Sequence, residues 1–412
     1  MLNNKIKNLK KRKAKELRFK LYGKIAIAFT LTFLVVLFSL ILWRAYPALY
    51  RSQIALDIDL TSYDANSNLE HIDYNFLVKK ALRNKFQKVF EQNIDQKELV
   101  NLNQILSRIS NFELQEQIAK NQQILGSSQL LWFSLSSKAD MYFKYNNFGN
   151  FSVRQLQFLR DLEDDGHIRQ VFNWQFFKNA DSREPEIAGI VVGLIGSLMV
   201  MTIFLILAFP IAVMCAFYLE EFASKNRLND IIEISINNLA AIPSIIYGLL
   251  GLVFYLQVMH LPRSSSLVGG MTLFMLVLPV IIIATRNTIR SIPQTIRDGA
   301  YGLGASKLQV TMHHLLPLSI PGIMTGSILA ISRALGETAP LLMIGMVAFI
   351  ADRAQSFVDP ATVLPVQIYL WSDLQENGFV EKTALAILVL LLVLMLFNLS
   401  AIILRKKFEK KW

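Results

Sequence analysis

The stretch Asp298–Pro317 reads DGAYGLGASKLQVTMHHLLP and is a polar loop between two long apolar runs. It combines an acid, two small residues, a glycine six positions after the acid (Gly304), and a Leu-Pro pair just before the next apolar run. The pattern predicts a short helix over Asp298–Leu308, parallel to a membrane surface, in which Gly304 leaves room for a partner. We expect Leu316-Pro317 and Pro321-Gly322 to stop this helix and turn the chain into the next span, because proline opposes helical continuation.

The chain around this loop is more apolar than an ordinary soluble protein. Of its 412 residues, 53% are hydrophobic, against roughly 45–50% in soluble domains. A transmembrane helix needs about 20 consecutive apolar residues. Six apolar windows therefore predict six transmembrane helices: Ile25–Trp43, Ile187–Leu219, Ile234–Pro262, Ser264–Thr285, Leu315–Ile350 and Thr383–Leu404.

Small residues recur four positions apart within these windows. Gly189 and Gly193 form one such pair, and a longer series follows in the fifth window: Gly322, Gly326, Ala330 and Ala334. Spacing of this kind lets two membrane helices approach closely. We therefore expect tight helix packing along both series.

Basic residues near the span ends predict the orientation. Residues 1–24 carry ten Lys or Arg and one acid, and residues 405–412 carry five Lys or Arg and one acid. Both tails are therefore expected in the cytoplasm. Four basic residues place the Asp298–Pro317 loop there too: Arg286, Arg290, Arg297 and Lys307. The net charge of +11 is concentrated in the tails, which favours topology signalling and contact with anionic lipid over nucleic-acid binding.

The expected organisation follows from these assignments. It comprises a basic cytoplasmic tail (1–24), a first transmembrane helix (25–46), a periplasmic insert (47–186), a membrane core (187–404) with a cytoplasmic loop (286–320), and a second basic tail (405–412). The insert is large enough to bury a core of its own. Apolar residues at helical spacing predict amphipathic helices over Asp73–Gln92 and Glu98–Ile118, so a mostly helical insert is expected. The aromatic stretch Leu130–Phe143 is compatible with strand or helix.

The insert shows no obvious site chemistry. His71 and His167 are isolated in the sequence and are interpreted as surface histidines. The run Glu163-Asp164-Asp165-Gly166 is interpreted as a turn, because it lacks the ligand series of a calcium loop. Cys215 is the single cysteine and lies in an apolar run, so no disulfide forms within the chain.

Arg333 and Glu337 interrupt the fifth apolar window and lie four residues apart, on one helix face. With the span starting near Pro321, Arg333 is expected about 18 Å along it, near the middle of the bilayer. Charges there cost roughly 2.5–3.5 kcal/mol each on insertion scales and usually pair or line a pathway. Two interpretations follow, an ion pair that locks the bundle or a polar translocation path. In the second, Arg333 attracts an oxyanion and Glu337 accepts a hydrogen bond from a protonated one such as phosphate, whereas sulfate offers no such donor.

The sequence contains no G-x-x-x-x-G-K-[ST] loop. After Gly299 and Gly304 come Ala305-Ser306 instead of Lys-Ser or Lys-Thr. Without a phosphate-cradling loop the chain is not itself the ATPase. We expect no catalytic residue, cofactor or metal ligand, and any ATP use requires a separate subunit.

Four passages together resemble the A-type permease subunit of bacterial phosphate ABC transporters, within the binding-protein-dependent inner membrane components. The loop described above is one, and it is similar to the family's coupling loop. The others are GSL at Gly196 with FPIA at Phe209 and FYLEEF at Phe217, NLAAIPSIIYGL at Asn238, and RALGETAPLL at Arg333. The loop departs from the family in beginning Asp298-Gly299-Ala300, where Glu-Ala-Ala is usual, and in having His314 at an isoleucine position.

The resemblance covers about residues 187–345 and implies an all-α membrane protein of the type I ABC importer fold, with six transmembrane helices. It implies partnership with a C-type permease subunit, an ATPase dimer and a periplasmic phosphate-binding protein, in the bacterial inner membrane. Carried over to this sequence, the pathway residues are Arg333, Glu337 and Thr338. The ATPase-coupling residues are Asp298, Gly299, Ala300, Gly304, Ala305, Leu316 and Pro317.

The sequence leaves three alternative functions open. The first is a permease for sulfate, molybdate or tungstate. The second is an ion-driven secondary transporter, which would work without an ATPase. The third is a membrane-anchored scaffold whose active part is the 47–186 insert.

Overall fold

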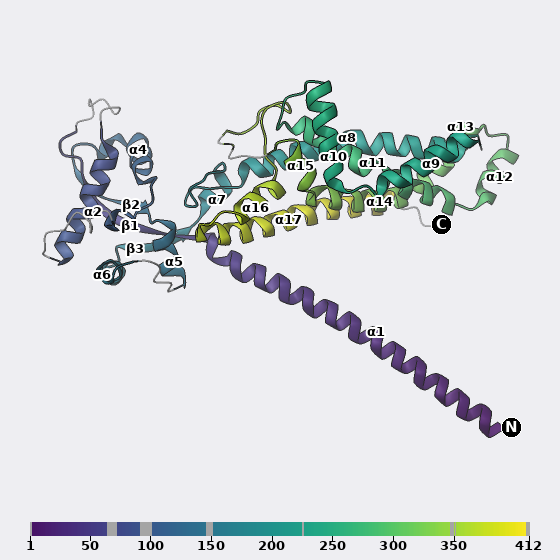
Figure 1. The fold of residues 1–412 in the computed structure, drawn as a ribbon, viewed down its shortest axis with the longest axis horizontal. Coiled ribbons are helices and arrows are strands. Elements are labelled where there is room, and N and C mark those ends of the chain that lie inside the picture. Colours follow the sequence, from purple (N-terminus) through teal and green to yellow (C-terminus); the bar gives the residue numbers. More distant parts are fainter. Residues whose placement is uncertain are drawn as a thin grey trace.

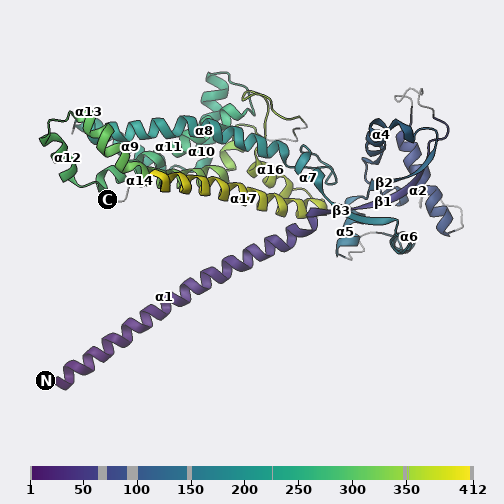
Figure 2. The same ribbon diagram turned by 180° about the vertical axis from the view of Figure 1, so that it is seen from behind.

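The computed structural model describes residues 2–63, 72–90, 101–145, 151–224, 226–346, 350 and 352–408. His71 lies outside these residues. The helical bundle, the insert and a long N-terminal helix are the three main parts of the molecule (Figure 1). Figures 1 and 2 show the insert at one end of the bundle and, at the other, the loop between α12 (Gln294–Gly302) and α13 (Lys307–Val310). The start of α1 (Leu2–Ala45) and the end of α17 (Asn377–Phe408) both lie toward the loop's end of the molecule.

The first helix, α1 (Leu2–Ala45), is 44 residues long and runs without a break through the expected tail and the expected first span. Its apolar side chains are exposed along Ile25–Trp43. At its end a short 3-10 helix, η1 (Tyr46–Leu49), leads into the insert, with Pro47 in its first turn.

The insert contains an antiparallel sheet that the sequence analysis did not anticipate. Its strands are β1 (Tyr50–Asp59), β2 (Ser128–Ser134) and β3 (Ile168–Phe172), in the order β2-β1-β3. On β1, Ile54, Leu56 and Ile58 are fully buried. Ala55 between them is also fully buried, so both faces of the strand are covered there, and only toward its end do exposed Asp57 and Asp59 alternate with buried residues. The alternation of apolar and polar residues at this end is visible in the sequence.

Helices cover this sheet and make up most of the insert: α2 (Tyr74–Phe90), α4 (Ser110–Lys120), α5 (Ser137–Tyr145) and α6 (Val153–Asp164). The helix expected over Asp73–Gln92 is confirmed in its described part. The one expected over Glu98–Ile118 is interrupted: residues 101–103 and the helix from Ser110 onward are helical, but between them Leu106 makes a β-bridge with Leu135. The stretch Leu130–Phe143 is both strand and helix, since β2 ends within it and α5 begins within it.

The Glu163–Gly166 run is only partly the expected turn: Glu163 and Asp164 are the last residues of α6, and the turn comprises Asp165 and Gly166. Gly166 has φ +71° and ends α6, and the backbone N–H of His167 donates to Leu162 O at 2.8 Å. Glycine adopts this left-handed conformation without the steric cost that a side chain brings.

Among the described residues, five helices are long and apolar enough to span a membrane, and a bent pair of helices brings the number to the expected six if it forms one span. After α1 come α8 (Val191–Phe217), α11 (Ser266–Ser291), the continuous helical run Lys307–Gly336, and α17 (Asn377–Phe408). The run Lys307–Gly336 consists of α13 (Lys307–Val310), the π-helical turn η6 (Thr311–Leu315) and α14 (Leu316–Gly336).

The third expected span, Ile234–Pro262, is not one straight helix. It is divided between α9 (Arg227–Ala240) and α10 (Ser244–Gly251), which continues as η5 (Leu252–Val258), with a bend of 104°. Pro243 causes the break because it has no N–H to donate to Leu239 O. The hydroxyl of Tyr247 donates to that carbonyl at 2.7 Å and stabilises the bend.

The small-residue series pack as expected. A methyl group at Gly322 or Gly326 would overlap the side chains of Thr288 or Ala284, so α14 lies tightly on α11. Gly193 is equally close to Gln367, on α16 (Leu364–Ser372). These contacts require glycine because no Cβ fits.

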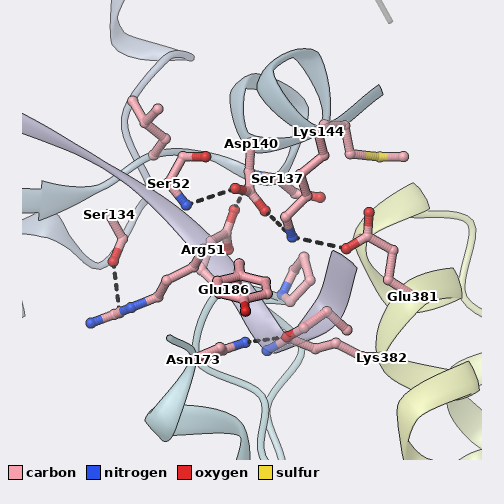
Figure 3. Close-up of a pocket in the computed structure, with 16 residues that line it drawn as sticks. Arg51, Ser52, Ser134, Ser137, Asp140, Lys144, Asn173, Glu186, Glu381 and Lys382 are labelled. Carbon is pink, nitrogen blue, oxygen red and sulfur yellow. Dashed lines mark hydrogen bonds and ion pairs between the residues drawn. The ribbon is translucent and has the colours of Figure 1, made fainter. Parts of the chain in front are cut away.

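A buried ionic joint ties the insert to α17 (Figure 3). Lys144 Nζ lies 2.6 Å from Asp140 Oδ2 and 2.9 Å from Glu381 Oε2, and Lys382 Nζ donates to Ala188 O at 2.7 Å. The cavity beside them measures about 40 Å³, which is room for a few water molecules. Three basic and three acidic side chains line it, so it has no net charge that would attract an anion: Arg51, Lys144, Lys382, Asp140, Glu186 and Glu381.

Candidate functional site

The 298–317 loop has a different internal structure from the one expected. Its helix is α12 (Gln294–Gly302), so Asp298, Gly299 and Ala300 lie inside a helix that ends before Gly304. Gly304 has φ +84°, and the N–H groups of Gly304 and Ala305 donate back to Tyr301 O (2.9 Å) and Ala300 O (3.1 Å). This pair of bonds is a Schellman cap, which needs glycine at the left-handed position.

A new helix starts immediately after this turn. The hydroxyl of Ser306 accepts from the N–H of Gln309 at 3.4 Å, and the Gln309 side chain accepts from the N–H of Ser306 at 2.8 Å. This reciprocal capping box fixes the start of α13. The chain therefore changes direction over three residues, Gly304, Ala305 and Ser306.

The expectation that Leu316-Pro317 stops the helix is wrong. Both residues lie within the continuous helical run, and Pro321 lies inside α14. The π-helical turn Thr311–Leu315 directly precedes them. A wide turn of this kind changes the hydrogen-bond register, so a proline can follow without ending the helix.

The tip of the loop exposes apolar side chains. Leu303 is 91% exposed, and Leu308 and Met312 are more than half exposed. A side chain at Gly304 would meet no atom within 4 Å. The loop thus offers an open, partly apolar surface to another molecule.

Arg297 fastens α12 to the bundle. Its guanidinium donates to Glu221 Oε1 at 3.0 and 3.3 Å, and to the carbonyls of Ile292 (2.8 Å) and Ile289 (3.0 Å). Both charged side chains are about nine-tenths buried. Glu221 lies in η4 (Tyr218–Phe222), the π-helical end of α8, so a displacement of α12 acts directly on that helix.

A second group of ion pairs continues from this point. Arg286 and Arg290 of α11 each contact both Glu220, beside Glu221, and Glu233 of α9, at 2.8–3.4 Å. The sequence analysis used these arginines only for orientation and assigned the glutamates no role. The signal was available, since Glu220-Glu221 and Arg286 with Arg290 each follow an apolar run.

The Arg333–Glu337 pair lies at the end of α14. Arg333 is in its last turn, Glu337 is the residue that ends the helix, and their Nε and Oε1 atoms are 3.4 Å apart. The helical run starts at Lys307, not near Pro321, so Arg333 lies about 39 Å along it. Its depth in a bilayer depends on where the membrane begins along this run, and it stays a prediction.

This pair adjoins the bend of the broken span. After Glu337 and Thr338 comes α15 (Ala339–Met343), and a Cβ at Gly248 of α10 would lie 2.7 Å from Pro340 Cα. The Arg333 side chain is 40% exposed and that of Glu337 18%. Both ions therefore remain accessible in the single chain, and Thr338 follows them at the same break. Within the described residues, no group of three His, Cys, Asp or Glu side chains is placed to hold a metal ion.

Comparison with known proteins gives the family. Residues 208–412 match the family described as binding-protein-dependent transport system inner membrane component. The chain is 31% identical over 196 residues to the phosphate transport system permease protein PstA of Haemophilus influenzae. The match covers 68% of that protein and 48% of this chain. The chain belongs to this family of inner membrane transport components.

Two further matches are with another permease and with a domain model. The probable ABC transporter permease protein YqgI of Bacillus subtilis is 28% identical over 244 residues, with 56% of this chain and 82% of that protein covered. Residues 6–150 match a domain of unknown function, which includes α1 and most of the insert.

Among solved structures, a chain of an inward-facing MetNI methionine ABC transporter is similar to this chain, with a TM-score of 0.43 and 16% sequence identity. The match covers 52% of this chain and 94% of that one.

Proposed function

We propose that this chain is the transmembrane permease subunit of an ATP-driven importer of inorganic phosphate and forms half of the translocation pathway. The observation that carries the proposal is kinship, because relatives 29–32% identical to it are phosphate transport system permease proteins. The chain is non-catalytic in this proposal, and a separate ATPase dimer supplies the energy. A C-type permease subunit completes the pathway and a periplasmic binding protein delivers phosphate.

The 298–317 loop is the proposed contact for the ATPase. Its exposed Leu303 and the open surface at Gly304 suit a docking contact, and Asp298, Gly299, Ala300 and Ala305 form the helix and turn beneath it. Leu316 and Pro317 belong to the helix that leaves the loop. Movement of α12 is passed on through Arg297 and Glu221 to α8, and through the second group of ion pairs to α9. With the loop in the cytoplasm, both ends of the chain are cytoplasmic and the insert is periplasmic.

Arg333, Glu337 and Thr338 are the proposed pathway residues. The half-exposed guanidinium attracts the anion, and the carboxylate accepts a hydrogen bond from a protonated phosphate oxygen. Sulfate is fully deprotonated at neutral pH and leaves that acceptor unpaired, which disfavours its passage.

Uptake of radiolabelled phosphate into proteoliposomes that contain the complete complex tests the function. We expect ATP-dependent uptake that excess sulfate, molybdate and tungstate do not inhibit. Strong inhibition by one of these would favour a permease for that oxyanion. Uptake without the ATPase would favour a secondary transporter.

A further inference from the structure

A cluster of aromatic rings lies where the insert meets the end of α1. Tyr46, Tyr50, Phe172 and Trp174 are connected ring to ring, with centroid distances of 5.6, 6.3 and 4.8 Å along the series. Tyr46 and Trp174 are each 62% exposed, and Phe172 is 38% exposed. We call Tyr46, Phe172 and Trp174 the aromatic foot of the insert.

Backbone bonds fix the foot at the point where α1 ends. Asn173 lies between Phe172, the last residue of β3, and Trp174, the first residue of α7 (Trp174–Lys178). Its backbone N–H donates to Leu49 O at 2.7 Å. Its buried side chain donates to Ala48 O at 3.1 Å (Figure 3). The foot therefore cannot move away from the end of α1 without breaking buried hydrogen bonds.

The apolar part of α1 sets the depth of the foot. The window Ile25–Trp43 is 19 residues long, which corresponds to about 28 Å of helix and so to the hydrocarbon thickness of a bilayer. Trp43, 72% exposed, marks its outer end. Tyr46 is three residues further on, and the tie through Asn173 holds Phe172 and Trp174 at the same level.

The chemistry of the foot matches the membrane interface. Tyr and Trp combine an apolar ring with a polar group and concentrate at the headgroup level of bilayers. The exposed Lys178 has its ammonium 5.8 Å from the centre of the Trp174 ring, where it could also reach a lipid phosphate. The position of this surface favours lipid over a protein as its partner, because the surface continues directly from the exposed apolar surface of α1.

We propose that the aromatic foot is embedded in the outer-leaflet interface and binds phospholipid headgroups, so that the insert rests on the membrane. The insert then has a fixed height and orientation above the bilayer. This inference does not depend on the transported substrate.

Spin labelling tests the proposal directly, because Cys215 is the single cysteine. Cys215 is first replaced by alanine, and a spin label is then attached to the Trp174→Cys variant of the full chain. The labelled chain is studied in its complex, reconstituted into nanodiscs of phosphatidylcholine and phosphatidylglycerol. Phe76→Cys is the matched control, since Phe76 is 59% exposed on α2, away from the foot (Figure 1). Two reagents that speed the relaxation of the spin label are compared at each position: oxygen, which concentrates in lipid, and a nickel chelate, which stays in water.

We expect a higher ratio of oxygen to nickel relaxation at 174 than at 76. Equal ratios would overturn the proposal, because position 174 would then face water. Protection of position 174 from both reagents would also overturn it, in favour of a covering protein subunit. A second test keeps Trp174 in place and measures tryptophan fluorescence. Lipids brominated near the top of their acyl chains should quench the fluorescence of the native protein more than that of the Trp174→Phe variant. Equal quenching of the two would contradict lipid contact.

Discussion

Glu221 and Arg297 form an ion pair, with 3.0 Å between Oε1 and Nη2, that joins the end of α8 to α12. The pair is about nine-tenths buried, and Arg297 also satisfies two carbonyl groups at the end of α11. Removing one partner of such a pair leaves a buried charge without compensation. Four hydrogen bonds from one side chain therefore hold the first helix of the 298–317 loop to the bundle, beside the apolar packing of Ile296 and Ala300.

Arg297→Ala should lower stability by about 3–5 kcal/mol, the usual cost of breaking a buried ion pair, and should reduce ATP-driven uptake. Arg290→Ala is the matched control. Its ion pairs are half exposed, so its cost should be under about 1 kcal/mol. Thermal unfolding of the purified complex and uptake per ATP hydrolysed are the measurements. Equal effects of the two substitutions would contradict a special role for Arg297.

Gly304→Ala should cost about 1–2 kcal/mol, because alanine is strained at φ +84°. Space does not limit this substitution, since a Cβ there meets no atom within 4 Å. We expect a shifted turn, weaker ATPase binding and lower uptake. Gly302→Ala is the control, because Gly302 also has open space but lies in α12 and is not among the positive-φ glycines. Uptake that is indifferent to Gly304→Ala would favour a transporter that works without an ATPase.

Arg333→Ala and Glu337→Ala should each abolish phosphate uptake while the complex still assembles. Assembly should persist because their ion pair is partly exposed, and pairs of this kind contribute at most about 1 kcal/mol. Uptake and co-purification of the subunits are measured in parallel. Normal uptake by both variants would remove the pair from the mechanism, and loss of assembly would instead favour an ion pair that locks the bundle.

Asp181 gives a prediction about pH. Burial raises its pKa to about 6, while the indole N–H of Trp371 donates to it at 2.8 Å. Because the folded pKa lies above the ordinary value near 4, the folded state favours the protonated acid. Stability from this group is therefore greatest below about pH 4 and is lost as the pH rises to about 6.

Asp181→Asn keeps an acceptor for Trp371 and removes the charge. It should raise the free energy of unfolding at pH 7.5 by up to about 3 kcal/mol, the equivalent of roughly two pKa units, and have little effect near pH 4. Thermal unfolding at both pH values measures this. The control is Asp164→Asn, since Asp164 is exposed. A stabilisation by Asp181→Asn that is the same at both pH values would contradict the assigned cause.

Part of the fold was readable from local pattern. Long apolar runs predicted the six spans because a membrane helix must satisfy its own backbone groups over about 20 residues. The helix α2 followed from apolar residues at helical spacing, and Gly322 and Gly326 predicted close packing of α14, although not its partner α11. The strand β1 was not predicted, although Ile54, Leu56 and Ile58 are separated by single residues as in a strand.

The candidate site was predicted less well than the spans. The turn was assigned to Leu316-Pro317, but the residue with the required backbone conformation is Gly304. Proline signals a possible break without enforcing one when a π-turn precedes it. Glu220, Glu221 and Glu233 received no role because their partners are 53–76 residues away in the sequence.

The sequence by itself determined that the chain crosses a membrane several times, which residues are apolar enough to do so, and which family it belongs to. These properties depend on composition and on local order, which no distant contact changes. Tertiary structure alone decided the attachment of α12 through Arg297 and Glu221 and the position of the aromatic foot. Each of these depends on groups far apart in the chain that meet only after folding, because buried charges and backbone groups must find partners there.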